Sequence, residues 1–102
     1  MNFEIINNKG VFEIHGDFTK AHTNQVANYF NNLLDKYYEI VICLKQVKCI
    51  DDKALNVMRF IVAKAKRRSK ILFVLGKDNK RINKQFKTAN LNNIFKNDYD
   101  SK

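Results

Sequence analysis

The 102-residue sequence lacks most of the features that mark secreted or membrane-spanning proteins. It has no proline, no tryptophan, three glycines and two cysteines. Cys43 and Cys49 are too few for a disulfide scaffold, and two further ligands for a structural zinc ion are missing nearby. No apolar run approaches the roughly 20 residues that cross a bilayer, and the N-terminus lacks the basic and apolar segments of a secretion signal. We therefore expect a cytoplasmic protein with reduced thiols and no transmembrane segment.

Residue patterns that support catalysis are also missing. The three glycines are isolated, so no glycine-rich loop could hold a phosphate, and nucleotide binding is disfavoured. Ser69 and Ser101 do not lie in a nucleophile elbow. His15 and His22 are seven residues apart without supporting carboxylate or cysteine spacing, so a shared site is a weak alternative to two separate histidines. We expect a protein that is not an enzyme and binds no cofactor or metal.

The composition and the charge distribution favour a folded, basic protein. With 45% hydrophobic and 12% aromatic residues, the chain suits one globular domain, predicted at residues 1–96, followed by a polar tail at residues 97–102. The net charge of +9 is concentrated in residues 59–87, which hold eleven basic residues and one acidic residue. Such a block attracts acidic partners such as nucleic acid, anionic lipid or an acidic protein face, although lysine-rich composition alone could also produce it. Binding of single-stranded nucleic acid would favour exposed aromatic residues among the basic ones, and the sequence of this stretch shows no aromatic residue that looks exposed.

Hydrophobic periodicity predicts alternating strands and helices. Residues 3–5 and 11–14 flank a turn at 7–10 and predict a hairpin, and residues 39–44 and 71–75 are short apolar runs typical of buried strands. Residues 91–95 are predicted as a final edge strand. Three apolar stripes have helical spacing: Val26, Phe30, Leu33, Leu34 and Tyr37; Leu55, Met58, Ile61, Val62 and Ala65; and Ile82, Phe86 and Ala89.

The predicted order is β-β-α-β-α-β-α-β, which indicates an α/β fold. We expect a mixed sheet of four to five strands with a largely parallel centre and helices packed against it. Thr19 or Thr23 is predicted to cap the first helix, and Asp51 is predicted to cap the second. The third helix is expected to begin near Asp78 and to end near Asn90.

The segment from Ile50 to Met58, IDDKALNVM, resembles the STAS domain of bacterial anti-sigma factor antagonists and sulfate-transporter tails. That family has a hydrophobic residue, then Asp-Ser-Ser/Thr-Gly-Leu-x-x-Leu, at the start of its second helix. The resemblance extends over about residues 3 to 96 and includes the order of elements, the ILFVLG strand and the closing segment from Ile82 to Phe95. It implies a STAS-like domain that binds protein partners.

The sequence departs from this family where the family is regulated. The position that a partner kinase commonly phosphorylates, and whose phosphorylation releases the partner, is Asp52 here. Lys53 and Ala54 follow in place of Ser/Thr and Gly, and Cys43 replaces the polar residue that usually ends the preceding strand. No serine or threonine occurs between residues 23 and 69, so the loop cannot be switched by phosphorylation.

The charge of Asp52 permits two interpretations. A carboxylate in the first turn of a helix interacts favourably with the helix dipole, by roughly 0.3–1 kcal/mol. It also carries about half the charge of a phosphoserine, which is about −1.5 to −2. Asp52 could therefore imitate the phosphorylated state, or it could only stabilise the helix, and Lys53 could partly neutralise it.

The resemblance implies a non-catalytic regulatory adaptor. Its partner would be a kinase-like anti-sigma factor, a transporter or a component of a lipid-transport complex, in which this chain would be an accessory STAS subunit. The predicted contact residues are Asp51, Asp52, Lys53, Asn56 and Arg59, with Lys20 or His22 nearby. The alternative is a nucleic-acid-binding module that uses the basic residues Arg67, Arg68, Lys70, Lys80, Arg81 and Lys84. Membrane attachment is weaker, because the core requires the apolar stripe of the second helix.

Overall fold

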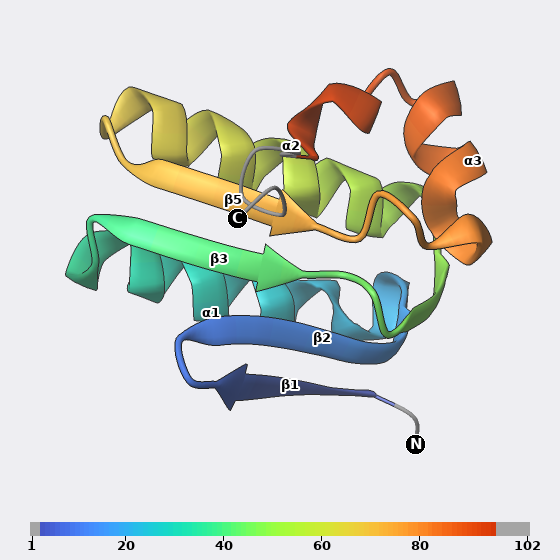
Figure 1. Cartoon of the computed structure of the whole chain (residues 1–102), viewed down its shortest axis with the longest axis horizontal. Coiled ribbons are helices and arrows are strands. Elements are labelled where there is room, and N and C mark those ends of the chain that lie inside the picture. Colours follow the sequence, from blue (N-terminus) through green and yellow to red (C-terminus); the bar gives the residue numbers. More distant parts are fainter. Residues whose placement is uncertain (1–2, 96–102) are drawn as a thin grey trace.

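The computed structural model describes residues 3–95, which form a mixed sheet with helices on one face (Figure 1). The strands are β1 (Phe3–Asn8), β2 (Val11–Phe18), β3 (Glu39–Cys43), β4 (Val47–Ile50) and β5 (Ile71–Leu75). The helices are α1 (Thr23–Lys36), α2 (Asp52–Arg67) and α3 (Lys80–Thr88), with 3-10 helices η1 (Lys20–His22) and η2 (Asn92–Ile94). The predicted α/β class is confirmed. The predicted tail at residues 97–102 lies outside the described residues.

The sheet is antiparallel at one edge and parallel elsewhere. Its strands follow the order β1-β2-β3-β5, and β4 pairs with β2. β1 and β2 form the predicted hairpin, closed by Lys9 and Gly10, whose φ angles of 53° and 92° suit a two-residue turn. β2, β3, β4 and β5 pair in parallel. The five strands agree with the predicted four to five.

Residues 45–50, between the predicted strand at 39–44 and the helix cap Asp51, include a strand that the sequence did not predict, β4. β2 pairs with β3 through residues 11–13 and then with β4 through residues 16–18. The register shifts at Gly16, whose φ of 97° favours glycine and whose N–H donates to the carbonyl oxygen of Gln46 at 3.1 Å. In β4 only Val47 and Ile50 are buried, so the strand has no alternating pattern by which sequence could identify it.

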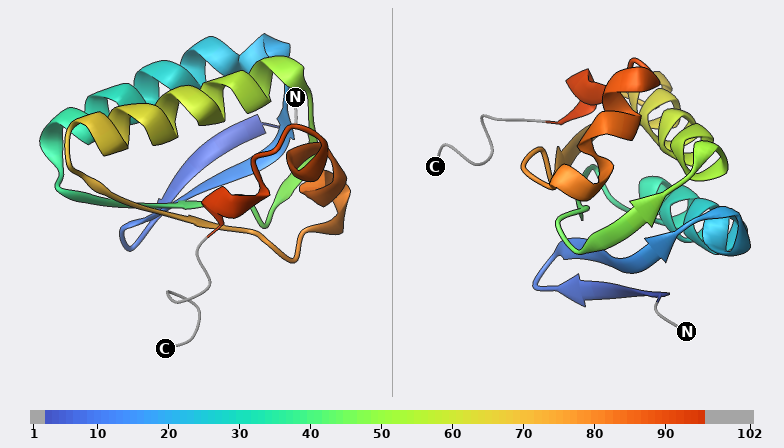
Figure 2. Two further views of the ribbon diagram at one scale, coloured as in Figure 1. Left: turned by 90° about the horizontal axis from the view of Figure 1, so that it is seen from above. Right: turned by 90° about the vertical axis from the view of Figure 1, so that its right-hand side faces the viewer.

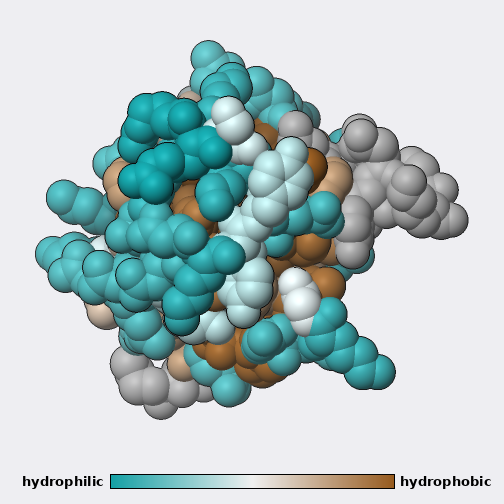
Figure 3. All heavy atoms as spheres, turned by 90° about the vertical axis from the view of Figure 1, so that its left-hand side faces the viewer, coloured by the Kyte–Doolittle hydropathy of each residue, from teal (hydrophilic) through white to brown (hydrophobic). Residues whose placement is uncertain are grey.

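The helices are arranged in one layer. α1 and α2 lie side by side over one face of the sheet, α3 lies at one end, and η2 lies nearer the middle of the molecule, close to β5 (Figure 2). Figure 3 views the opposite end, where α2 finishes. There, hydrophilic residues cover the helix side, and hydrophobic residues gather toward the sheet side.

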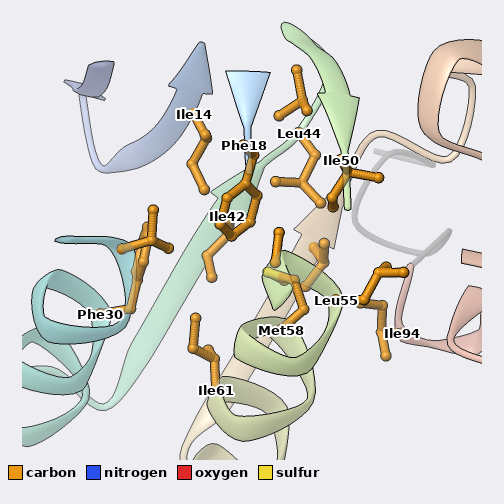
Figure 4. Packing of buried hydrophobic residues seen from close by; sticks show 14 of the residues in the cluster. Ile14, Phe18, Phe30, Ile42, Leu44, Ile50, Leu55, Met58, Ile61 and Ile94 are labelled. Carbon is orange, nitrogen blue, oxygen red and sulfur yellow. The ribbon is translucent and has the colours of Figure 1, made fainter. Parts of the chain in front are cut away.

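The core fills the space between the sheet and the helix layer. Ile14 and Phe18 of β2 meet Phe30 of α1 and Met58 and Ile61 of α2 (Figure 4). All five side chains are 0% exposed. Burial of each such side chain contributes roughly 1.5–3 kcal/mol. The core therefore sets the position of α2, which carries most of the predicted contact residues.

Two details of the first helix differ from the prediction. Tyr37 was expected in the apolar stripe but is 50% exposed, because α1 ends at Lys36 and Tyr37 is extended. Neither Thr19 nor Thr23 caps the helix through its side chain. The hydroxyl of Thr23 instead donates to the carbonyl oxygen of Lys20 at 3.1 Å, because the preceding 3-10 turn places an acceptor there.

The predicted final strand at residues 91–95 is wrong in its type but correct in its place at the sheet edge. Residues 92–94 form η2, and only Phe95 bridges to Val74 of β5. Leu91, Ile94 and Phe95 are all buried. Their spacing of three and one places them on one side of a helical turn, whereas a strand would alternate.

Asn79 anchors α3 against the sheet. Its side-chain oxygen accepts from the N–H of Arg81 at 3.1 Å, so Asn79 caps the helix, which begins at Lys80, close to the predicted start near Asp78. Its Nδ2 donates to the carbonyl oxygens of Leu44 and Val47, both at 2.8 Å. These bonds hold the beginning of α3 beside the β3–β4 loop.

Candidate functional site

The carboxylate of Asp51 holds the loop that leads into α2. Its Oδ1 accepts from the backbone N–H of Ala54 at 3.0 Å, and its Oδ2 accepts from the backbone N–H of Lys20 at 2.8 Å. The first bond confirms the predicted cap of α2, and the second ties the helix start to η1. Asp51 therefore fixes the position at which α2 begins.

Asp52 and Lys53 form the first turn of α2, and both are exposed. Among the described residues, neither side chain has a hydrogen-bond partner or an ion pair, so Lys53 does not neutralise Asp52 by direct contact. The positive end of the helix dipole lies beside the Asp52 carboxylate. This turn therefore presents an unpaired negative charge to solvent.

A groove of about 610 Å³ separates the first half of α2 from α3. Arg59 spans it: one guanidinium nitrogen donates to Asn56 Oδ1 at 2.7 Å, and the other donates to the carbonyl oxygen of Ala89 at 2.8 Å. Three predicted contact residues therefore lie in one site with residues of α3. The groove is lined by Asp52, Leu55, Asn56, Arg59, Lys84, Gln85, Thr88 and Ala89.

The structure adds α3 to a site that the sequence placed at the start of α2, with Lys20 or His22 nearby. Lys84 was assigned to the basic patch, and Gln85 and Thr88 were not singled out. The helical periodicity of α3 predicts which of its polar residues face outward. Their position opposite Asp52 depends on how α3 packs, for which the sequence has no local signal.

The two residues expected near the site have different roles. Lys20 lies beside it, since its backbone N–H binds Asp51. The ring of His22 stacks on Phe3, with ring centres 4.2 Å apart. His15 instead contacts Glu13, with Nε2 2.8 Å from Oε1, so the two histidines have separate partners.

The six residues of the predicted basic patch do not lie together. Arg67, Arg68 and Lys70 lie where α2 ends and β5 begins, whereas Lys80, Arg81 and Lys84 belong to α3. α3 borders the first half of α2, and α2 is roughly 24 Å long at 1.5 Å per residue. The patch is thus divided between the two ends of α2, because the chain reverses direction through β5.

Two further features of the basic stretch differ from expectation. Phe60, an aromatic residue within it, is 43% exposed. Lys64 is only 5% exposed, and its Nζ donates to the backbone and side-chain oxygens of Asn31 and lies 3.2 Å from Asp35 Oδ1. The hydrogen bond from Lys64 lowers the pKa of Asp35, and the charge of Arg68 adds to this effect. The Lys64 charge is therefore compensated within the protein.

Two other titratable groups respond to their neighbours. The hydrogen bond to His15 lowers the pKa of Glu13, as does the one to Asn8. Cys49 is exposed, but neighbouring protein atoms remove part of the water around its thiol, and this loss of solvation raises its pKa. The hydrogen bond from its Sγ to Asp17 Oδ1 at 3.3 Å raises the pKa further. A raised pKa keeps this thiol protonated and less reactive near neutral pH.

Two other features, a metal-binding cluster and a membrane-spanning helix, are absent from the described part of the chain. No group of three or more His, Cys, Asp or Glu side chains within residues 3–95 could hold a metal ion. Over the same range, no helix is both long and apolar enough to cross a membrane.

Comparison with known proteins identifies the fold. No family model matches the sequence, and no curated protein matches it. The crystal structure of an anti-sigma factor antagonist from Mycobacterium paratuberculosis is similar, with a TM-score of 0.69 and 13% identity over 91% of this chain and 80% of that chain. The anti-sigma factor antagonist SpoIIAA in its unphosphorylated form is similar with a TM-score of 0.56 and 8% identity, over 71% and 70% of the two chains. The chain therefore has the STAS fold that its sequence predicted.

Proposed function

We propose that this protein is a non-catalytic regulatory module that docks on a partner protein through the groove between α2 and α3. The observation that carries the proposal is that Asp52, Asn56 and Arg59 line this one groove. Its similarity in fold to anti-sigma factor antagonists supports a partner of the kinase-like anti-sigma type, in the cytoplasm. A transporter or a lipid-transport component is the alternative partner.

The chemistry of the groove suits a protein surface. Asp52 contributes a negative charge, Arg59 and Lys84 contribute positive charges, and Leu55 contributes an apolar contact. Charges of both signs around an apolar centre favour a complementary protein face over a ligand of one charge. The Asp51 cap holds the helix start in place before a partner arrives, which lowers the ordering cost of binding.

Docking on this surface would not be controlled by phosphorylation of the loop. The family's phosphorylated position is Asp52, and the nearest residues with hydroxyl groups along the chain are Tyr37 and Tyr38 before it and Ser69 after it. We take Asp52 as a direct contact for the partner. The fraction of partner bound would then depend on the concentrations of the two proteins, because modification of this turn could not release the partner.

The test is capture of partners from a nuclease-treated lysate of the source organism, with mass spectrometry of the retained proteins. Wild type is compared with Asp52→Arg and with Glu4→Arg, an equal charge change at an exposed position of β1. We expect one protein to be retained by wild type and Glu4→Arg and lost with Asp52→Arg. Its dissociation constant, measured with purified proteins, should rise at least tenfold for Asp52→Arg, about 1.4 kcal/mol.

The identity and behaviour of the retained protein decide between the alternatives. A kinase-like regulator supports the anti-sigma type, and a transport component supports the alternative. Equal loss in Asp52→Arg and Glu4→Arg would indicate a general charge effect. An affinity that Asp52→Arg leaves unchanged would exclude this groove as the docking site.

A further inference from the structure

Two exposed tyrosines lie at the end of the molecule opposite the α2–α3 groove. Tyr38 is 66% exposed and Tyr37 is 50% exposed, and together with Phe60 they are the exposed large hydrophobic residues of the described chain. They are adjacent in sequence, in the turn between α1 and β3. Single exposed apolar side chains are common on protein surfaces, but a pair beside a basic cluster is a more specific feature.

The fold brings this turn against the basic end of α2. Lys70 Nζ donates to the carbonyl oxygen of Tyr37 at 3.2 Å, and the N–H of Ile71 donates to the carbonyl oxygen of Tyr38 at 2.9 Å. Arg68 Nη1 lies 3.3 Å from Asp35 Oδ1, near the end of α1. Figure 1 shows both turns at the same end of the molecule, and Figure 3 looks directly at that end. We name this region the basic tyrosine surface; it consists of Lys36, Tyr37, Tyr38, Arg67, Arg68 and Lys70.

The charge of this surface is positive after its acidic residues are considered. Asp35 forms ion pairs with both Lys64 and Arg68, so its negative charge offsets positive charge on those two residues. Within residues 3–95, Glu39, exposed at the start of β3, is a second carboxylate close to this turn. Lys36 and Arg67 are exposed, and neither has an ion pair among the described residues. Basic groups therefore outnumber acidic groups around the two rings.

We propose that the basic tyrosine surface binds single-stranded nucleic acid. The rings of Tyr37 and Tyr38 stack on unpaired bases, and Lys36, Arg67 and Lys70 contact phosphates. Proteins that bind single strands combine these two elements, because stacking is available to every base and the phosphates supply the electrostatic attraction. Tyr37 and Tyr38 come from a segment about 30 residues before Arg67, so the sequence alone does not place them beside these basic residues.

An anionic membrane is less well suited to the same surface. Membrane attachment needs an apolar face that enters the lipid, and the apolar face of α2 is buried in the core. Tyr37 and Tyr38 are the only exposed large apolar side chains described at this end. The inference is independent of the proposed function, because the groove is at the other end of α2.

The test is fluorescence anisotropy of a labelled 20-nucleotide oligothymidylate, titrated with the full chain between 50 and 200 mM salt. With three to four phosphate contacts, the slope of log affinity against log salt should be about −2 to −3, a loss of roughly 20- to 50-fold across this range. Tyr37→Ala and Tyr38→Ala should each weaken binding at least fivefold, and both Tyr→Phe variants should retain it. Arg67→Ala should also make the slope less steep by about 0.7.

Lys80→Ala with Arg81→Ala is the matched control, because it removes two exposed basic groups from α3 instead, neither of which lines the α2–α3 groove. Circular dichroism and thermal midpoints confirm that each variant is folded. The proposal is overturned if the control weakens binding as much as Arg67→Ala with Lys70→Ala, since binding would then be diffuse. Unchanged affinity in the double Tyr→Ala variant also overturns it. The same holds if wild type binds phosphatidylglycerol vesicles and fails to bind the oligonucleotide.

Discussion

Replacement of Asp51 by alanine should lower the free energy of unfolding by about 2 kcal/mol. Loss of an N-cap costs about 1 kcal/mol, and the bond from Asp51 Oδ1 to the Ala54 N–H is such a cap. The bond from the Lys20 N–H to Oδ2 adds about 1 kcal/mol, below the usual value for a charged hydrogen bond because Lys20 is exposed and water can replace it. For a domain of this size the thermal midpoint should fall by about 8–16 °C.

The assay is urea unfolding followed by circular dichroism, with the midpoint shifted and the slope unchanged. Asp51→Asn keeps one acceptor oxygen and should lose about half as much, since asparagine caps as well as aspartate. Asp52→Ala removes an adjacent carboxylate that has no bonded partner, so it should lose only about 0.3–1 kcal/mol. Comparison of Asp52→Ala with Asp51→Ala therefore separates the stability contributed by the capping hydrogen bond from that contributed by a negative charge near the helix start.

A second variant isolates the bond to Lys20. Lys20 opens η1, and Thr19 before it is extended, with φ −132° and ψ −178°, which is compatible with a following proline. Lys20→Pro removes the donor N–H, so Asp51→Ala should cost only about 1 kcal/mol in that background. A loss below about 0.5 kcal/mol for Asp51→Ala in the wild-type background would refute the assignment of both bonds.

Two further predictions concern stability. Gly76→Ala should destabilise the fold by about 1–3 kcal/mol in urea unfolding, because φ is +127° and the new Cβ would lie 3.1 Å from Leu44, whereas Gly10→Ala, with φ +92° and open space, should cost less. Asp35→Asn should be less stable than wild type at pH 7. The difference should shrink as pH falls below about 4, the ordinary pKa of an aspartate, because folding lowers the pKa of Asp35. The ionised carboxylate stabilises the fold above that pH, and protonation at lower pH removes the contribution. A constant difference across an acid titration would contradict that origin.

Local features of this protein were predictable from sequence because they depend on neighbours along the chain. The apolar runs at β3 and β5 and the helical stripes on α1 and α2 report periods of a few residues. Asp51 caps α2 by accepting a hydrogen bond from the backbone N–H of the residue three positions later, Ala54. The motif beginning at Ile50 also predicted the STAS fold, which the solved structures share despite identities of 13% and 8%.

Features that join distant segments required the tertiary structure. Sequence did not reveal β4, whose pairing depends on the shift at Gly16. It also did not divide the basic stretch between the two ends of α2. It did not place Lys84 opposite Asp52, or Tyr37 beside Lys70. These contacts join residues about 30 positions apart, and the packing of helices on the sheet decides them, because a local pattern shows only which face of an element is buried and not which element covers it.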